Sequence, residues 1–350
     1  MNASTMTRPA APDSATLRRP AAVRMLWLLA GVVALMVLAT LSIAFGVRAV
    51  NVDDIVAALA GHTDTVSQAA IVKRIPRTVL ALLVGAALAL SGASMQAVTR
   101  NPIADPGILG VTNGASLAVV VGIAFLGIAD PYSFMVFAIA GAAGAGVFVY
   151  AVGSLGRGGA TPLKLALAGA ATSAAFASLI SAVMLPRVDL LQVFQSWQIG
   201  GVGGAEWPRI SATAPVLAVG ALICFVCARG MNSLALGDDM AAGLGENVFR
   251  TRLVSALGAV ILAGAATALA GPIGFIGLVV PHMCRMLVGT DHRWLLPFSA
   301  VAGAALLVAA DIVGRVIAPS SQEIQVGIVT AVIGAPFFIW IVRRQKVREL

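Results

Sequence analysis

The sequence predicts an all-α, polytopic membrane protein, and three observations support this prediction. Hydrophobic residues make up 59% of the chain and charged residues only 11%, far from the usual composition of soluble globular proteins. The hydrophobic residues gather in charge-free runs, each close to the roughly 20 residues that a helix needs to cross the hydrocarbon core. Most charges fall in the short gaps between these runs. A soluble fold has no means of hiding so much apolar surface, so the function is one carried out across a membrane.

Ten membrane spans follow from these runs. Eight runs each predict one span, and they cover residues 25–47, 78–99, 106–129, 131–156, 165–186, 210–228, 294–310 and 324–342. The run over 253–284 is too long for one helix and contains residues 271–274 (Gly-Pro-Ile-Gly), a combination that marks a break. We therefore expect two helices there, joined by a tight turn, with the second ending near Arg285. The stretch 187–205 is too short and too polar to span, and we expect it to form a short helix at the outer surface.

The two ends of the chain frame a single membrane domain. Residues 1–22 lack apolar periodicity and predict a disordered cytoplasmic tail. Residues 23–343 form the ten-helix transmembrane domain, and residues 344–350 form a second short tail. A cleaved signal peptide is the alternative for residues 1–46, but the apolar run is longer than such a signal needs and lacks a convincing small-residue cleavage site. The gaps between runs are too short for a soluble catalytic domain.

Lysine and arginine predict the orientation of the spans. With ten spans and a cytoplasmic N-terminus, sixteen of the 23 basic residues face the cytoplasm and seven face outward, as the positive-inside rule requires. Both termini are then cytoplasmic. The formal net charge of +8 is mostly a collar at the inner surface, and it does not indicate a nucleic-acid partner.

The order of the spans contains an internal symmetry. Spans two to five run inward, outward, inward and outward, whereas spans seven to ten run in the opposite sense. Two inverted four-helix blocks, separated by span six, are typical of transporters built from inverted repeats. The topology therefore favours transport over other membrane functions.

The chain lacks the motifs of catalysis. A phosphate-binding loop needs Gly-x-x-x-x-Gly-Lys-Ser/Thr, and no lysine stands in that context. The three histidines are far apart and lack metal-ligand spacing. Cys224 and Cys227 form a lone C-x-x-C pair in an apolar run, and we interpret them, like Cys284, as ordinary buried thiols. We expect no enzymatic activity, catalytic residue, metal or cofactor on this chain, which argues against a membrane enzyme.

Carboxylates inside membrane spans would indicate coupling to protons or sodium ions. Every Asp and Glu falls in a gap or at a span end, including Asp105, Asp130, Asp311 and Glu323. An ion-coupled secondary carrier is the alternative from another functional class, and this distribution argues against it. Another source of energy is then required.

Three stretches of the sequence carry specific motifs. They are residues 74–77 (Arg-Ile-Pro-Arg) with 85–92 and 101–107 (Asn-Pro-Ile-Ala-Asp-Pro-Gly); residues 271–282 (Gly-Pro-Ile-Gly-Phe-Ile-Gly-Leu-Val-Val-Pro-His) with 291–293 (Asp-His-Arg); and residues 311–315 (Asp-Ile-Val-Gly-Arg) with 334–338 (Gly-Ala-Pro-Phe-Phe). In combination they closely resemble the FecCD-type permease subunits of bacterial ATP-binding-cassette (ABC) importers for iron–siderophore complexes, haem and vitamin B12. The resemblance covers roughly residues 25–342 and includes the permease of the vitamin B12 importer.

The resemblance implies a dimer of permeases, homomeric or heteromeric, in the bacterial cytoplasmic membrane. The dimer would enclose the path of an iron(III)–siderophore complex. Two cytoplasmic ATPase subunits would hydrolyse ATP, and an extracytoplasmic binding protein would deliver the ligand. Haem and vitamin B12 importers share every motif quoted above, so they remain the nearest alternatives.

Matching positions also imply roles for individual residues. Arg74, Arg77 and Arg315 lie at outer span ends, where the positive-inside rule disfavours basic residues, and would meet carboxylates of the binding protein. The alternative is that they reach lipid headgroups. Asn101 and Pro102 would contribute to an inner gate together with Thr161, although a purely structural turn at Asn101-Pro102 explains them equally well. The match at Thr161 is looser, because Pro162 follows it where the family often has Ser or Thr.

Residues 236–246 (Leu-Gly-Asp-Asp-Met-Ala-Ala-Gly-Leu-Gly-Glu), between spans six and seven, resemble the coupling helix that these permeases insert into a groove on the ATPase. We expect this helix at about 238–249, with its acidic residues at the favourable N-terminal end. A simple connecting loop is the alternative. The residues expected to contact the ATPase are Asp239, Met240, Ala242, Gly243, Leu244 and Gly245.

Overall fold

The structure is a computed structural model that describes residues 20–46, 50–107, 110–128, 130–155, 162–187, 194–195, 197–317 and 323–344. Within these residues every regular element is an α-helix, so the predicted all-α class is confirmed. Residues 1–19 and 345–350 of the two predicted tails lie outside the described residues, as do Thr161 and residues 188–193 and 196 of the stretch predicted as an outer-surface helix. The described ends of the predicted tails are helical, since α1 begins at Ala21 and α14 ends at Arg344.

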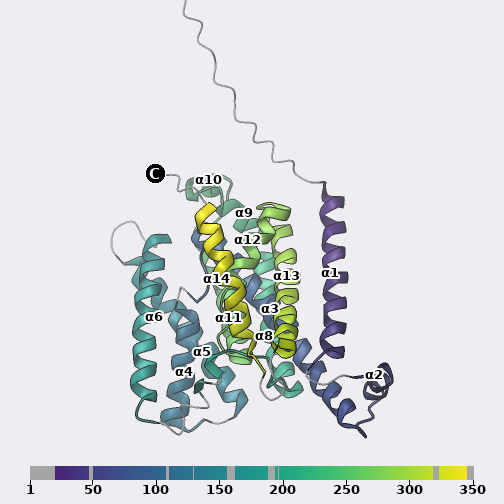
Figure 1. The fold of residues 1–350 in the computed structure, drawn as a ribbon. Coiled ribbons are helices and arrows are strands. Elements are labelled where there is room, and N and C mark those ends of the chain that lie inside the picture. The colour runs from purple at the N-terminus through teal and green to yellow at the C-terminus, as the bar shows by residue number, and fades with distance from the viewer. Residues whose placement is uncertain are drawn as a thin grey trace, which may run out of the picture.

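The helices follow one another along the chain with short connections. Their bounds are α1 (Ala21–Ala44), α2 (Val52–Leu59), α3 (Val66–Thr99), α4 (Val111–Leu126), α5 (Pro131–Ser154), α6 (Pro162–Met184), α8 (Trp207–Val226), α9 (Ala228–Leu234), α10 (Asp238–Gly243), α11 (Val248–Ala270), α12 (Ile276–Val288), α13 (His292–Ile317) and α14 (Val326–Arg344). Figure 1 shows them as a bundle, with α2 at one end and α9 and α10 at the other.

Seven of these helices are long and apolar enough to cross a membrane: α1, α3, α5, α6, α8, α11 and α13. The other three predicted spans correspond to the shorter apolar helices α4, α12 and α14. The predicted break in the long run of residues 253–284 is present, since α11 ends at Ala270 and α12 begins at Ile276. Its connection is a five-residue segment rather than a tight turn, and it ends at Phe275, whose φ of +71° is unusual for a residue other than glycine.

Helix α3 is the central element of the bundle (Figure 1). Of its most apolar stretch, 78% is buried inside the protein. Gly85 lies against the backbone of Gly303 in α13, and Gly92 lies against the backbone of Gly277 in α12, so a Cβ at either position would overlap a main-chain carbonyl. Small residues of this kind allow helices to approach closely in a membrane, where dispersion forces replace the hydrophobic effect between helices.

Helix α1 contrasts with α3 because it stands at the edge of the bundle (Figure 1). Only 6% of its apolar stretch is buried, and it packs mainly against α13 and α3. The exposed side chains of Leu26, Val33 and Met36 are suited to contact with lipid acyl chains. Side-chain packing therefore holds α1 weakly, and its position depends strongly on contacts at its ends.

Candidate functional site

Arg74 and Arg315 hold the C-terminal end of α1. The Arg74 side chain in α3 donates hydrogen bonds to the carbonyl oxygens of Ile43 at 3.1 Å and Ala44 at 3.0 Å. Arg315 in α13 donates to the carbonyl oxygens of Ser42 and Phe45, each at 3.0 Å, and to the Ser42 hydroxyl at 2.8 Å. The last carbonyls of a helix lack partners within the helix. The two guanidinium groups supply these partners and place positive charge at the negative end of the helix dipole.

Arg77 lies beside them and is paired with two carboxylates. Its Nη2 is 2.8 Å from Oδ1 of Asp311, and its Nη1 is 2.6 Å from Oε2 of Glu323. Asp311 also pairs with Arg315, at 3.1 Å. The side chain of Asp311 is only 2% exposed, whereas that of Glu323 is 43% exposed. Asp311 therefore acts as the buried centre of the ionic cluster, and Glu323 lies at its rim.

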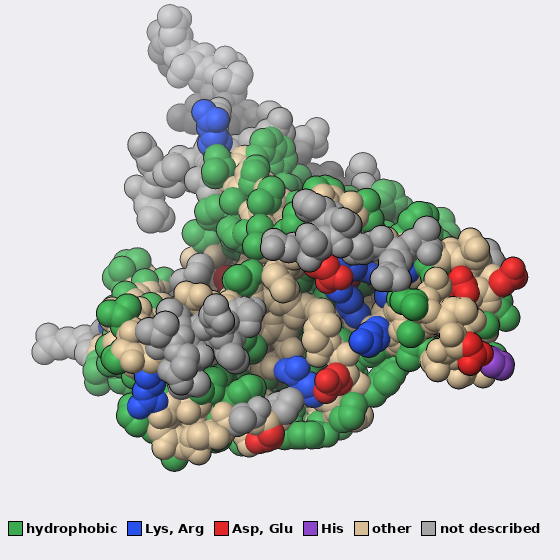
Figure 2. Space-filling view, turned by 60° about the horizontal axis from the view of Figure 1, so that its bottom comes forward, with side chains coloured by type: hydrophobic (Ala, Val, Ile, Leu, Met, Phe, Trp, Pro, Cys, Tyr) green, Lys and Arg blue, Asp and Glu red, His purple; other side chains and the backbone are tan. Residues whose placement is uncertain are grey.

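The three arginines predicted for docking thus come together at the end of the bundle that carries α2. Figure 2 shows basic and acidic side chains gathered near the middle of this face. The side chains reach α1, Asp311 and Glu323. The sequence reasoning missed the role of Asp311, although its spacing of four residues from Arg315 is typical of a helical ion pair.

The opposite face of the bundle presents α10. All six residues predicted to contact an ATPase are exposed, namely Asp239, Met240, Ala242, Gly243, Leu244 and Gly245. Met240 and Leu244 are 61% and 65% exposed, and Leu236 and Phe249 add further apolar surface nearby. Ala241, by contrast, is fully buried. Ala241 is therefore the buried residue of α10, and the rest of the helix leaves an apolar patch exposed.

The predicted extent of this helix was too long. Helix α10 covers Asp238–Gly243, and residues 248–249 belong to α11. The chain turns at Gly245, which has a φ of +83°. Glycine adopts this conformation at little cost, so Gly245 ends the helix in the way that glycine commonly does.

The predicted gate residues follow the end of α3. Arg100 caps α3 with a φ of +50°, and the Asn101 side-chain oxygen accepts a hydrogen bond from the backbone N–H of Ile103 at 3.1 Å. This bond stabilises a turn, which is the structural role weighed for Asn101. Pro102 is exposed, and Thr161, the third gate residue, lies outside the described part of the chain.

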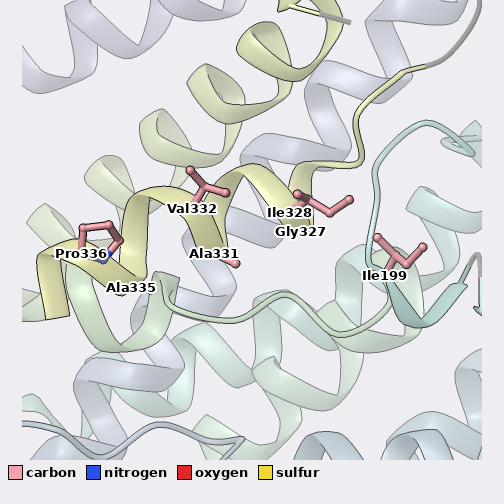
Figure 3. Close-up of a pocket in the computed structure, with 7 residues that line it drawn as sticks. All are labelled: Ile199, Gly327, Ile328, Ala331, Val332, Ala335 and Pro336. Atoms are coloured by element: carbon pink, nitrogen blue, oxygen red, sulfur yellow. The ribbon is translucent and has the colours of Figure 1, made fainter. Parts of the chain in front are cut away.

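Two open cavities of more than about 400 Å³ are bordered by described residues. One, of about 640 Å³, runs along α14 and is lined by Ile199, Gly327, Ile328, Ala331, Val332, Ala335 and Pro336. Figure 3 shows these residues on one side of α14, with Ile199 on the neighbouring segment. The other, of about 410 Å³, is bordered by Asp105, Asn113, Ser173 and the connection between α11 and α12. Within the described residues, no group of three or more His, Cys, Asp or Glu side chains is arranged to hold a metal ion.

A bundle of apolar helices whose charged clusters lie at its two faces has the architecture of a multi-pass membrane transport protein. Residues 34–344 match the FecCD transport family, and the chain belongs to that family. It is 47% identical to the probable siderophore transport system permease YfiZ of Bacillus subtilis, covering 77% of this chain and 81% of the relative. It is 42% identical to the ferric enterobactin transport system permease FepD of Escherichia coli, and the match covers 90% of this chain and 94% of that relative.

A solved structure shares the fold. This is a metal-chelate type ABC transporter in an inward-facing conformation, matched with a TM-score of 0.80 and 28% identity over 92% of this chain and 99% of that one. The family resemblance read from the three motif stretches is therefore confirmed.

Proposed function

We propose that this chain is the membrane permease subunit of an ATP-driven importer for an iron(III)–siderophore complex. One observation supports it above the others: a FecCD-family bundle presents a short helix with an exposed apolar patch at one face, where an ATPase would bind. Relatives named for siderophore and ferric enterobactin transport support the cargo. Relatives named for hemin and cobalamin make those ligands the alternatives.

We propose that the chain crosses the bacterial cytoplasmic membrane ten times, with two inverted four-helix blocks. The seven long helices and the three shorter apolar ones, α4, α12 and α14, together give the ten. The start of α1, helix α10 and the end of α14 lie at the same end of Figure 1, as expected for an even number of crossings. The transmembrane permease domain is then residues 23–343, flanked by cytoplasmic tails at 1–22 and 344–350.

The partners follow from the two faces. Two cytoplasmic ATPase subunits would each receive one α10, supplied by a pair of permeases. The second permease would pack near α14, whose groove is lined by small and apolar residues and would border the path. ATP would bind the ATPase subunits, so this chain would need no cofactor.

The outer arginine cluster would receive the binding protein. Arg77 and Arg315 both pair with Asp311, and Arg77 also pairs with Glu323. Arg77 would make the direct contact, because its second partner, Glu323, is exposed and an incoming carboxylate can replace it. Arg74 and Arg315 would add positive charge behind Arg77 while they hold α1. Such charge steers association more than it tightens the complex.

The Glu323→Gln variant tests this docking proposal. Freeing Arg77 from its exposed partner is expected to speed association of the ligand-loaded binding protein by about two- to fivefold. The rate should fall as salt rises, because screening limits steering to about 8–10 Å near physiological ionic strength. Stopped-flow or surface-based kinetics would measure both effects. Glu206→Gln is the matched control, since it removes one exposed negative charge at the start of α8 without freeing Arg77. Equal association rates in the wild type and Glu323→Gln would show that these arginines hold α1 and do not dock the binding protein.

Reconstitution tests the function itself. Vesicles containing this permease, its ATPase and its binding protein are expected to accumulate a ferric siderophore only when ATP is present. The cavity bordered by Asp105 favours the second candidate, an ion-coupled carrier, because a carboxylate on the wall of a cavity can take up a cation. Uptake driven by an ion gradient without ATP would establish that carrier. A panel of ferric siderophores, haem and cobalamin would decide the cargo.

A further inference from the structure

Three charged side chains from separate elements meet beneath α10. Asp238 is the first residue of α10, Arg100 caps the end of α3, and Arg252 lies in the first turns of α11. Oδ1 of Asp238 pairs with Nη2 of Arg100 and, at 3.0 Å, with Nη2 of Arg252. The second carboxylate oxygen, Oδ2, accepts a further hydrogen bond from Arg252 at 3.3 Å. One carboxylate thus connects α10 to two helices of the bundle.

This carboxylate holds together two groups that would otherwise repel each other. Burial and the neighbouring Arg252 lower the pKa of the Arg100 guanidinium, in that order of importance. The Arg252 side chain is only 15% exposed, and its Nε is buried without a hydrogen-bond partner. Arg100 also has the left-handed conformation that arginine seldom adopts. Asp238 therefore stabilises a local arrangement of charge and backbone that neither arginine favours alone.

The position of the cluster links two functional segments. Ala241 is the buried residue of α10, and its apolar side chain makes no directional bonds. Arg100, in contrast, is continuous with α3 on one side and with Asn101 and Pro102 on the other. Asp238 therefore forms a direct ion-pair link between α10 and the end of α3.

We propose that Asp238 is a positioning residue that transmits movement of α10 to the cytoplasmic end of α3 and to the turn at Asn101-Pro102. This inference rests on the proposed function of α10 as the ATPase contact. In it, Asp238 does not touch the ATPase or the cargo. It keeps the ends of α3 and α11 at fixed positions relative to α10 during each cycle of ATP hydrolysis.

The test compares transport per ATP hydrolysed in the reconstituted complex. Asp238→Asn and Arg252→Gln are expected to lower this ratio by about two- to fivefold, the effect of losing a partly exposed ion pair. Arg100→Asn is expected to do the same, and it isolates the charge because asparagine tolerates the left-handed conformation. Arg250→Gln is the matched control, since it removes an exposed charge two residues from Arg252. The Asp238→Glu variant should regain most of the coupling.

The expected pattern also includes non-additivity. The double variant Asp238→Asn, Arg100→Asn should be no worse than Asp238→Asn alone, because Asp238→Asn already removes the pair with Arg100. An unchanged ratio in Asp238→Asn with normal ATPase binding would overturn the inference, as would an Asp238→Glu variant as defective as Asp238→Asn. Failure of the wild-type chain to bind any ATPase would instead overturn the proposed function, so the two failures are distinguishable.

Discussion

Replacing Asp311 by asparagine is expected to destabilise the folded chain by about 3–5 kcal/mol, the usual effect of removing one partner from a buried ion pair. Asp311 is 2% exposed and pairs with both Arg77 and Arg315, and Arg315 is itself only 3% exposed. Asparagine keeps the shape of the side chain but leaves two cationic groups without their buried counter-charge. Reversible unfolding of the purified protein in detergent or bilayers would measure the change in the free energy of unfolding.

Glu323→Gln is the control for this experiment. It removes the other carboxylate from Arg77, but Glu323 is 43% exposed, so water can replace it and the expected loss is at most about 1 kcal/mol. Destabilisation of similar size in both variants would show that Asp311 has no special role. Stability equal to wild type in the Asp311→Asn variant would show that the buried ion pairs do not stabilise the fold.

Gly243→Trp is expected to weaken assembly with the ATPase by about 5- to 150-fold, corresponding to the roughly 1–3 kcal/mol that added volume costs at a packed contact. A Cβ built at Gly243 meets no other atom of this chain within 4 Å. The variant chain should therefore fold normally and fail only where a partner covers α10. Titration of the purified permease with the ATPase would give the affinity, and uptake by vesicles would fall in parallel.

Gly144→Trp supplies the matched control, because a Cβ at this exposed position on α5 also meets nothing within 4 Å. It adds the same volume away from α10 and is expected to leave ATPase binding unchanged. Gly245 is less informative, since its φ of +83° would strain any side chain even without a partner. Normal ATPase affinity in Gly243→Trp would remove the assignment of α10 as the contact.

The sequence predicted a helix boundary correctly where glycine and proline interrupt an apolar run. Residues 271–274 broke a long apolar run, and the structure has its helix boundary there. Run length was less reliable because apolar residues continue into connections: the run 106–129 contains the shorter α4, Val111–Leu126. The extent of α10 was overestimated because the turn at Gly245 was not given enough weight.

The candidate site was predictable only in part, for a physical reason. The location of Arg74, Arg77 and Arg315 at an end of the bundle follows from their positions at the ends of apolar runs. Their partners do not, because Ser42 and Arg315 are 273 residues apart and no local pattern joins them. The same holds for Asp238 and Arg100, which meet only because α3 and α10 end at the same face of the bundle.

Helix α3 is a single continuous helix that joins the two ionic clusters. Arg77 belongs to the outer ionic cluster and Arg100 to the inner one, and the helix between them contains no proline. At 1.5 Å per residue this segment is a rod about 35 Å long. Tilting such a rod by about 5° around its middle displaces each end by about 1.5 Å, enough to break a hydrogen bond of ordinary length. A small rotation of α3 caused by docking near Arg77 would thus displace Arg100 relative to Asp238. Conversely, a movement of α10 that displaces Arg100 would shift Arg77.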